Sequence, residues 1–535
     1  STIIDQNDTT FKRMLGLIRG RVYYNMASCS RVLAMLPGVA MNRKWMAKVM
    51  GFREGMADMA KPPLQKPGSL EKIVDALRFA NTTIRLELNH WLLPLRLKRF
   101  YKRLNSSLSK SEQALKAMRV DELIAYYHQL ENQLLSRWDA GLINDFFAIR
   151  FYDLLSERCK KWLGDKHGTL KNSLLCDAGG MISAEPAKSV RAMAEIVVTI
   201  DSAKEVFING SLREIEKWVA MHPALEKAYR DYLQQFGDRC LDELKLESET
   251  LHDNPILLFR SIGQLAHRLS GEVVAPYGDV GASIRATAER GVNRTLAGKR
   301  IKRFRFYRIL SKVRQRVRDR ENLRFERTRL FARVRRIFVE IGQRFTEANI
   351  LDKQGDIFYL ETNEISAYIQ GTSTSMRLKE LVAIRRAEFK SYQSMDVPAD
   401  RFETRGLVYL GNDFKSLQHA VIPGSDTDSL QGLGCCPGTV KAKVRVIKDP
   451  KHANLKSGEI LVAERTDPGW IMLFPAASAI LVERGSLLSH SAIVAREMGI
   501  PAVVSVNGLM HWLKDGDTVE VDGSTGRINR ISKSI

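Results

Sequence analysis

The stretch GSLLSHSAIVAREMGIPAVV, residues 485–504, places a single histidine between a glycine-containing turn and a short helix. Ser489 is a favourable N-cap, and Gly499 can close the helix in the left-handed conformation after about two turns. We therefore predict His490 at an exposed helix N-terminus, where free amide groups and the helix dipole stabilise a phosphate. A neutral imidazole is also a nucleophile near neutral pH. The residues alone leave two interpretations open, a phosphoryl carrier and an ordinary capping or packing histidine.

The same stretch resembles the phosphohistidine domain shared by phosphoenolpyruvate synthase, pyruvate phosphate dikinase and rifampin phosphotransferase. The common core of that domain reads G-G-x-x-S-H-x-A-I-x-A-R-E-x-G-I-P-A-V, and Ser486 at the second glycine is the departure from it. The resemblance implies a small α/β swivelling domain in which His490 accepts a phosphoryl group from ATP and carries it to a distant acceptor site.

Neighbouring segments extend this resemblance across residues 432–535. GLGCCPGTVKAKVRVIKD, residues 432–449, resembles the domain's opening glycine-rich hairpin. GEILVAERTDPGWIMLF, residues 458–474, resembles its next strand and Thr-Asp-Pro loop, which makes Thr466 a candidate for the phosphate or acceptor site together with Ser489. DGDTVEVDGSTGRI, residues 515–528, predicts a closing hairpin because two short strands flank turn-forming residues.

Upstream, apolar residues recur at helical spacing, so residues 1–395 read as almost wholly helical. Pro94 is expected to kink or divide a long helix there. Residues 396–431 are richer in polar and turn-forming residues and are assigned as a linker. The predicted fold is therefore multidomain, with a large mainly α-helical acceptor-binding domain over residues 1–395 followed by the small α/β phosphohistidine domain over residues 432–535.

Several helical segments resemble the acceptor-binding domain of rifampin phosphotransferase and of related prodigiosin-forming enzymes, and they occur in the same order. The resemblance implies that R-E-x-x-R, containing Arg320, Glu321 and Arg324, faces the phosphohistidine. The segments are GRVYYN (20–25), LINDFFAIRFY (142–152), FGDRCLDEL (236–244), and RENLRFERTRLFARVRRIFVEIG (320–342) followed by GDIFYLETNEI (355–365).

FGDRCLDEL supplies three further site candidates, Asp238, Arg239 and Glu243. A carboxylate can take a proton from an acceptor hydroxyl while an arginine stabilises phosphate charge. Relatives often have Gly-His-Arg where this chain has Gly-Asp-Arg, so Asp238 replaces a histidine. The structural alternatives are a salt bridge at a helix end for these residues and a solvated helix face for Arg320 and Arg324.

Composition sets broad limits on the chain. It has 535 residues, of which 44% are hydrophobic and 27% charged, enough for about two to four domains. An uninterrupted run of 18 apolar residues is absent and the six cysteines are irregularly spaced, so we expect a cytoplasmic protein without a membrane partner. The adjacent Cys435 and Cys436 are predicted to be packing residues because vicinal cysteines seldom form a disulfide.

The net charge is +22, and the excess is concentrated between residues 299 and 336. Apolar residues recur among these cations at three- and four-residue steps, which predicts a long amphipathic helix. Three interpretations of its basic residues stay open: a solvated face, an anion-binding wall for phosphorylated intermediates, and a docking surface for an acidic partner. We do not expect nucleic acid to be a partner.

A nucleotide site is not recognisable, because neither an ATP-grasp domain nor a glycine-rich Walker loop is evident. We therefore expect ATP and Mg to bind outside this chain, on an ATP-grasp domain or on a separate subunit as in phenylphosphate synthase. Metal sites are not indicated, since the ten histidines lack ligand spacing.

The leading functional hypothesis is a phosphotransferase that passes a phosphoryl group from ATP through phospho-His490 to a small acceptor, expected to carry a hydroxyl group. One alternative is a ligase that uses a phosphorylated intermediate for condensation. Another is a noncatalytic scaffold that binds an acidic partner through residues 299–336. The sequence does not identify the acceptor.

Overall fold

The computed structural model describes residues 7–34, 69–200, 202–240, 242–271, 279–399, 401–412, 414, 427–450, 453 and 455–533. The chain forms two compact units, each built from separate stretches. The first comprises residues 1–109, 117–143 and 341–420, and the second comprises residues 110–116, 144–340 and 421–535. Residues 415–426 of the predicted linker lie outside the described residues, and the boundaries of the three predicted domains stay a prediction.

Among its described residues, the first unit has helices and one small hairpin, which the helical pattern did not predict. Arg19 and Gly20 both have positive φ, +48° and +70°, so they form a tight turn that suits antiparallel pairing. The described elements of this unit are α2 (Asp8–Lys12), β1 (Leu15–Ile18), β2 (Arg21–Tyr24), α3 (Met26–Ala34), α6 (Ser69–Ser107), α8 (Val120–Gln133), the 3₁₀ helices η1 (Leu135–Arg137) and η3 (Gln354–Tyr359), α18 (Thr362–Gln370) and α19 (Leu378–Ser394).

Helix α6 continues through Pro94 over 39 residues, so of the two predicted outcomes, a kink or a division, the division does not occur and the kink stays a prediction. Proline removes one backbone hydrogen bond and crowds the preceding turn. Leu93, Leu97, Phe100 and Leu104 nevertheless form one buried stripe across the proline. The packing of this stripe holds the helix together where local preference alone favours a break.

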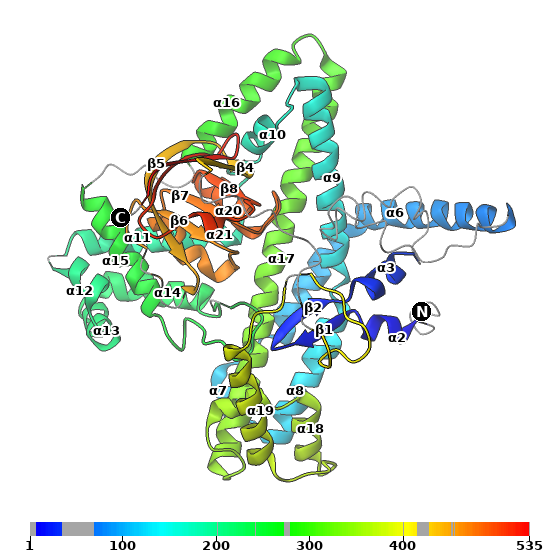
Figure 1. The fold of residues 1–535 in the computed structure, drawn as a ribbon, viewed down its shortest axis with the longest axis vertical. Helices are drawn as coiled ribbons and strands as arrows, with labels where there is room; N and C mark the ends of the chain where they lie inside the picture. The colour runs from blue at the N-terminus through cyan, green and yellow to red at the C-terminus, as the bar shows by residue number, and fades with distance from the viewer. Residues whose placement is uncertain are drawn as a thin grey trace. The chain divides into compact units, whose positions relative to one another are not determined.

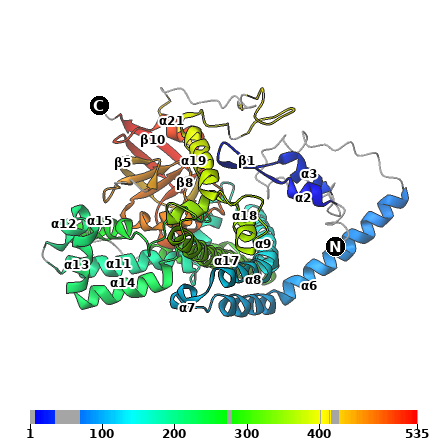
Figure 2. The same cartoon turned by 90° about the horizontal axis from the view of Figure 1, so that it is seen from below.

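The helices of the second unit include the long basic helix predicted from the sequence, α17, which is continuous over 48 residues (Figure 1). Helices α11 to α15 gather on one side of the sheet in both views (Figure 1, Figure 2). The bounds are α7 (Glu112–Ala117), α9 (Asp139–Leu163), α10 (Thr169–Leu174), η2 (Ile182–Ala184), α11 (Glu185–Val198), α12 (Ala203–Asn209), α13 (Leu212–Met221), α14 (Pro223–Phe236), α15 (Ile256–Gly271), α16 (Asp279–Thr295) and α17 (Arg300–Glu347).

The same unit contains an eight-stranded sheet in the order β3-β10-β9-β5-β6-β7-β8-β4. Strands β5, β6, β7 and β8 are parallel to one another, and the remaining pairs are antiparallel. The elements are β3 (Ser429–Gln431), β4 (Leu433–Cys436), β5 (Thr439–Ile447), β6 (Ile460–Ala463), η5 (Pro468–Met472), η6 (Phe474–Ala476), β7 (Ala479–Val482), α20 (His490–Met498), β8 (Ala502–Val504), α21 (Leu509–Trp512), β9 (Thr518–Asp522) and β10 (Arg527–Ser532).

The parallel strands are buried on both faces. Leu461 and Ile480 pack in one core with the apolar side of α20, whereas Val462 and Leu481 pack in a second core that includes α21. Alternate residues therefore face opposite cores, as the period of a strand requires. This packing fixes α20, and with it His490, against one face of the sheet.

Two hairpins were predicted in this sheet, and one of them forms. β9 and β10 pair antiparallel as expected. The glycine-rich segment at residues 432–449 is not a hairpin: β4 pairs with β8, while β5 pairs with β9 and β6. Between them Gly438 has φ +137°, a backbone conformation that glycine adopts easily, and the chain there departs toward a different strand.

Gly499 ends α20 with φ +68°, and a Cβ atom there would lie 2.9 Å from the Val280 Cβ. Gly499→Ala is therefore expected to lower the free energy of unfolding by about 1–2 kcal/mol. Gly291→Ala is the matched control, because that Cβ meets nothing within 4 Å inside helix α16, and it should stabilise by about 0.5–1 kcal/mol. Urea unfolding of both variants measures the difference, and equal effects would contradict the strain argument.

Within the described residues, every helix is too short or too polar to cross a bilayer.

Candidate active site

His490 is the first residue of α20, as predicted, and Ser489 occupies the N-cap position. The Ser489 side chain does not cap the helix, because its Oγ lies 3.2 Å from Ser491 Oγ and accepts no backbone N–H. The predicted exposure of His490 is also wrong, since its side chain is only 4% exposed. The imidazole is covered because a glutamate of α17 lies directly against it.

That glutamate is Glu321, one of the predicted site residues. His490 Nδ1 lies 2.8 Å from Glu321 Oε2, and the Glu321 side chain is 1% exposed. Burial opposes ionisation of Glu321, but the hydrogen bond and charge of His490, with the charges of Arg324 and Arg320, lower its pKa to about 2. Glu321 is thus a carboxylate at neutral pH, and it can accept hydrogen bonds but cannot donate them.

This pairing assigns the two nitrogens of His490. A carboxylate acceptor requires Nδ1 to carry a proton, so in the neutral imidazole Nε2 holds the lone pair. Nε2 is buried and has no hydrogen-bond partner among the described residues. The imidazole is therefore held in the tautomer in which Nε2 is the nucleophile.

Arginines of α17 surround this pair. Arg324 lies 3.5 Å from the second Glu321 oxygen, and Arg320 lies 3.9 Å from an oxygen of Asp145 on α9. The Nε atoms of Arg320 and Arg327 are buried without a hydrogen-bond partner in the described part of the chain. Guanidinium groups suit phosphate oxygens, so this helix face presents cations next to the glutamate that binds His490.

A second buried group contains Arg239 and Glu243. Arg239 donates from NH1 to the Pro468 carbonyl at 2.9 Å, and the same nitrogen lies 3.5 Å from Glu243 Oε1. Thr328 of α17 donates its hydroxyl to Glu243 Oε2 at 3.0 Å. Burial raises the pKa of Glu243, while the charges of Arg239 and His490 oppose that rise.

Asp238 does not join this group. Its carboxylate pairs with Arg336 and lies 3.9 Å from His252 Nε2, so the helix-end salt bridge considered for it is what forms. Thr466 lies in the loop before η5, and its buried Oγ1 has no hydrogen-bond partner among the described residues. In the next residue, Asp467, burial raises the carboxyl pKa, and the charge of His490 is among those that lower it.

Sequence reasoning missed Thr328, Arg327 and Asp145. The first two follow Arg320 and Arg324 at helical spacing, so the period of α17 places them on or beside the same face. That signal was present in the sequence. The pairing of Asp145 with Arg320 joins residues on two separate helices and carried no local signal.

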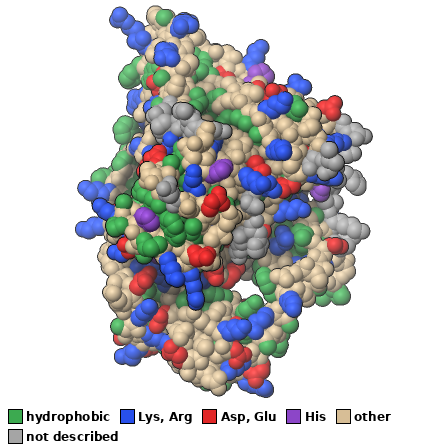
Figure 3. Space-filling view, turned by 90° about the vertical axis from the view of Figure 1, so that its left-hand side faces the viewer, with side chains coloured by type: hydrophobic (Ala, Val, Ile, Leu, Met, Phe, Trp, Pro, Cys, Tyr) green, Lys and Arg blue, Asp and Glu red, His purple; other side chains and the backbone are tan. Residues whose placement is uncertain are grey.

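Seven of the fifteen arginines of α17 form ion pairs with acids, and all seven lie between residues 314 and 336. Beyond Arg320 and Arg324, the ion pairs of α17 are Arg314 with Glu289, Arg316 with Asp319, Arg329 with Glu326, Arg335 with Asp253, and Arg336 with Asp238. On the face drawn in Figure 3, lysine and arginine side chains are dispersed among acids and other residues. The middle of this helix is thus largely charge-paired, whereas its first residues, 300–305, are exposed, so the three interpretations of the basic residues stay open for that end.

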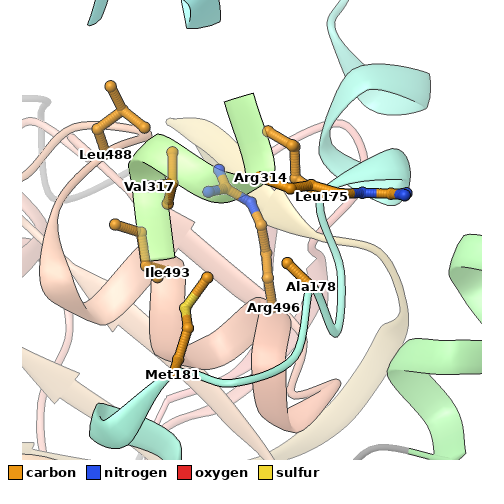
Figure 4. A pocket seen from close by; sticks show the side chains of 8 residues that line it. All are labelled: Leu175, Ala178, Met181, Arg314, Val317, Leu488, Ile493 and Arg496. Atoms are coloured by element: carbon orange, nitrogen blue, oxygen red, sulfur yellow. The ribbon is translucent and has the colours of Figure 1, made fainter. Parts of the chain in front are cut away.

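The C-terminal half of α20 holds the domain against the segment after α10. Arg496 is 2% exposed and donates to the carbonyls of Cys435 and Leu487 and, at 3.3 Å, to the Asn172 amide oxygen. Glu497 accepts from the backbone of Ala178 at 2.8 Å. Figure 4 shows the adjoining apolar seam, whose cavity of about 10 Å³ is at the lower limit for one water molecule.

The adjacent cysteines are buried free thiols, as expected. Burial raises the pKa of the Cys435 thiol to about 11. No cluster of three metal-ligating side chains occurs among the residues that the structure describes.

The eight-stranded sheet and helix α20, which begins with His490, together define a class of protein module. Residues 455–526 match the family described as PEP-utilising enzyme, mobile domain. Residues 144–321 match the rifampicin phosphotransferase fourth domain. Both matches confirm the resemblance that the sequence motifs indicated, and they place His490 and Glu321 in the two matched regions.

Curated relatives agree with these matches. An uncharacterised protein of Mycobacterium tuberculosis is 38% identical over 215 residues, which is 40% of this chain and 23% of that protein. Rifampicin phosphotransferase of Streptomyces sviceus is 26% identical over 71% of this chain and 43% of the relative. Prodigiosin synthesizing transferase PigC of Serratia marcescens is 26% identical over 76% of this chain and 46% of the relative. The chain thus spans less than half the length of these relatives.

Proposed function

We propose that this chain acts in phosphoryl transfer, with His490 Nε2 carrying the phosphoryl group to a small hydroxyl-bearing acceptor presented by the helical region. The observation that carries the proposal is the buried His490–Glu321 pair at 2.8 Å, in which Nε2 is left as the nucleophile and Arg324 lies 3.5 Å from the same glutamate. The similarity to rifampicin phosphotransferases supports the same reaction class.

Each residue then has a defined task. Glu321 orients the imidazole and stabilises the positive charge that develops on it when Nε2 bonds to phosphorus. Arg320 and Arg324 stabilise the phosphoryl oxygens during transfer, because fixed cations in a buried site act more strongly than in water. In the second half-reaction the N–P bond breaks, Nε2 keeps the electron pair, and the P–O bond to the acceptor forms.

The burial of Nε2 requires movement in this mechanism. A nitrogen that is enclosed against α17 cannot meet a donor at the same time, so the domain must leave this position to be phosphorylated. We propose that the domain of residues 432–535 swivels between the helical region and an ATP site with Mg on a domain or subunit outside this chain. The contacts of Arg496 and Glu497 hold the acceptor-facing position.

Arg324→Ala tests the assignment of the two half-reactions. We expect transfer from phospho-His490 to the acceptor to slow about 10- to 1,000-fold, because a phosphoryl-stabilising cation is lost only there. Phosphorylation of His490 by the complete ATP-binding component should stay within about threefold of wild type. Rapid-quench assays with γ-labelled ATP and β-labelled ATP measure both steps.

The matched control is Arg329→Ala on the same helix, because Arg329 pairs with Glu326 at 2.6 Å and has no part in the mechanism. Equal slowing of both half-reactions in Arg324→Ala, or no slowing, would return Arg324 to a purely structural role. Absence of acid-labile, base-stable label on His490 in the wild type would refute the proposed function itself.

A further inference from the structure

We propose that Glu243 is the base that takes the proton from the acceptor hydroxyl, and that the acceptor is an uncharged alcohol or phenol. The inference rests on the proposed phosphoryl transfer through His490 and deepens it, because it names a second catalytic group and the chemical class of the acceptor.

The two oxygens of Glu243 have different environments. Oε2 is fixed by the Thr328 hydroxyl at 3.0 Å. Oε1 is buried, lies 3.5 Å from Arg239 NH1, and has no hydrogen-bond partner among the described residues. The Glu243 side chain is only 5% exposed. One oxygen therefore holds the carboxylate in place while the other keeps its lone pairs for a bound group.

Helix α17 sets the spacing between Glu243 and the phosphoryl carrier. Glu321 binds His490, and Thr328 binds Glu243. These two residues are seven positions apart, so they lie on one face of the helix about 10 Å apart along its axis. Arg324 occupies the intervening turn of that face. This spacing lets a phosphoryl group on the carrier and the base address one acceptor oxygen from the same helix face.

Two other carboxylates that the sequence singled out, Glu321 and Asp238, are less suited to act as the base. Glu321 is committed to His490, and its pKa of about 2 makes it a weak base. Asp238 is paired with Arg336. Burial raises the pKa of Glu243, which makes its carboxylate a stronger proton acceptor. The charge of Arg239 beside it opposes that rise.

The transfer step is balanced with Glu243 in this role. The acceptor O–H bond breaks and its proton goes to Glu243 Oε1, while the acceptor oxygen bonds to phosphorus. The N–P bond breaks, and the electron pair stays on His490 Nε2. An anionic acceptor is disfavoured because a second negative charge would lie against a buried carboxylate. Phe325 adds an apolar neighbour, since its ring centroid lies 5.2 Å from the Arg239 guanidinium carbon.

The reverse reaction tests the role of Glu243 without knowledge of the natural acceptor. Phenyl phosphate and 4-nitrophenyl phosphate are offered to the wild-type chain as phosphoryl donors to His490. Protonated Glu243 must supply a proton to the departing phenolate, which is a poor leaving group, whereas 4-nitrophenolate leaves without one. Glu243→Gln should slow labelling of His490 by phenyl phosphate about 100-fold or more and by 4-nitrophenyl phosphate less than about threefold.

Glu326→Gln is the matched control, since Glu326 is also buried but pairs with Arg329; both rates should be kept. Equal losses with the two esters, or no loss, would overturn the role of Glu243. Wild-type labelling by the small donor phosphoramidate but by neither ester would overturn the acceptor class. Absence of label on His490 even from phosphoramidate would instead refute the proposed function. Labelling by phosphoramidate also shows that the Glu243→Gln variant is folded.

Discussion

His490→Ala is expected to abolish phosphoryl transfer, with no label on the chain and no phosphorylated acceptor. Nε2 of His490 is the proposed attachment point for the phosphoryl group. Labelling by γ- and β-labelled ATP with the complete ATP-binding component, followed by acid and base treatment, measures the loss. His511→Ala is the matched control, because His511 is an exposed histidine of the same domain and should label fully.

Folding of the variant must be checked separately, because His490→Ala removes the partner of a buried carboxylate. Glu321 Oε2 then loses its hydrogen-bond partner at 1% exposure, which costs about 1–3 kcal/mol, although Arg324 still lies 3.5 Å from Oε1. His490→Gln restores an amide donor near Glu321 without a nucleophilic nitrogen, so it should be more stable than His490→Ala and equally inactive. Retained turnover in either folded variant would remove His490 from the mechanism.

Glu321→Gln is expected to have the second largest effect, a loss of about 10³- to 10⁴-fold in phosphoryl transfer with His490 intact. The amide can donate to Nδ1, which would favour the tautomer with the proton on Nε2, and it cannot stabilise a positive imidazole. Nitrogen-15 NMR of the imidazole should show that the proton moves from Nδ1 to Nε2. Single-turnover assays measure the loss of rate. Unchanged rates would show that the 2.8 Å contact only packs the domain.

The same variant has an acid-stability signature. The pKa of Glu321 in the folded chain is about 2, below the ordinary 4.5, so its ionisation stabilises the fold above pH 4.5 and is lost as pH falls toward 2. As the pH falls from 4.5 to 2, the free energy of unfolding should therefore decrease less for Glu321→Gln than for the wild type. Thermal melts at steps through this range measure the difference.

Local patterns predicted the parts of the site that depend on neighbouring residues. The capping serine position, the two turns of α20 and the left-handed Gly499 follow from short-range preferences, and they formed. The family resemblance also indicated Glu321 as a residue facing His490. Their actual contact joins residues 169 positions apart, and its consequence, a buried imidazole instead of an exposed one, depends on tertiary packing.

Two of the wrong predictions of secondary structure, at Pro94 and at residues 432–449, have the same origin. Pro94 breaks helices by local preference, yet a continuous buried stripe overrides it in α6. The segment at residues 432–449 has the composition of a hairpin, but its strands find partners elsewhere in the sheet. The short hairpin β1–β2 was hidden within a helical pattern because each of its strands has only four residues. At Pro94 and at residues 432–449, packing or pairing with distant residues decided between locally acceptable alternatives, whereas the β1–β2 hairpin pairs neighbouring residues.

The continuity of helix α17 limits which mutations this site can accept during evolution. Glu321, Arg324 and Thr328 are correctly spaced only because the backbone between them is an unbroken helix. Side chains on this segment can be exchanged one by one, as different acceptors would demand. A single inserted or deleted residue, however, rotates everything beyond it by about 100° and separates the residue that holds the carrier from the residue that holds the base. The register of this helix thus constrains the length of the segment more strictly than its composition.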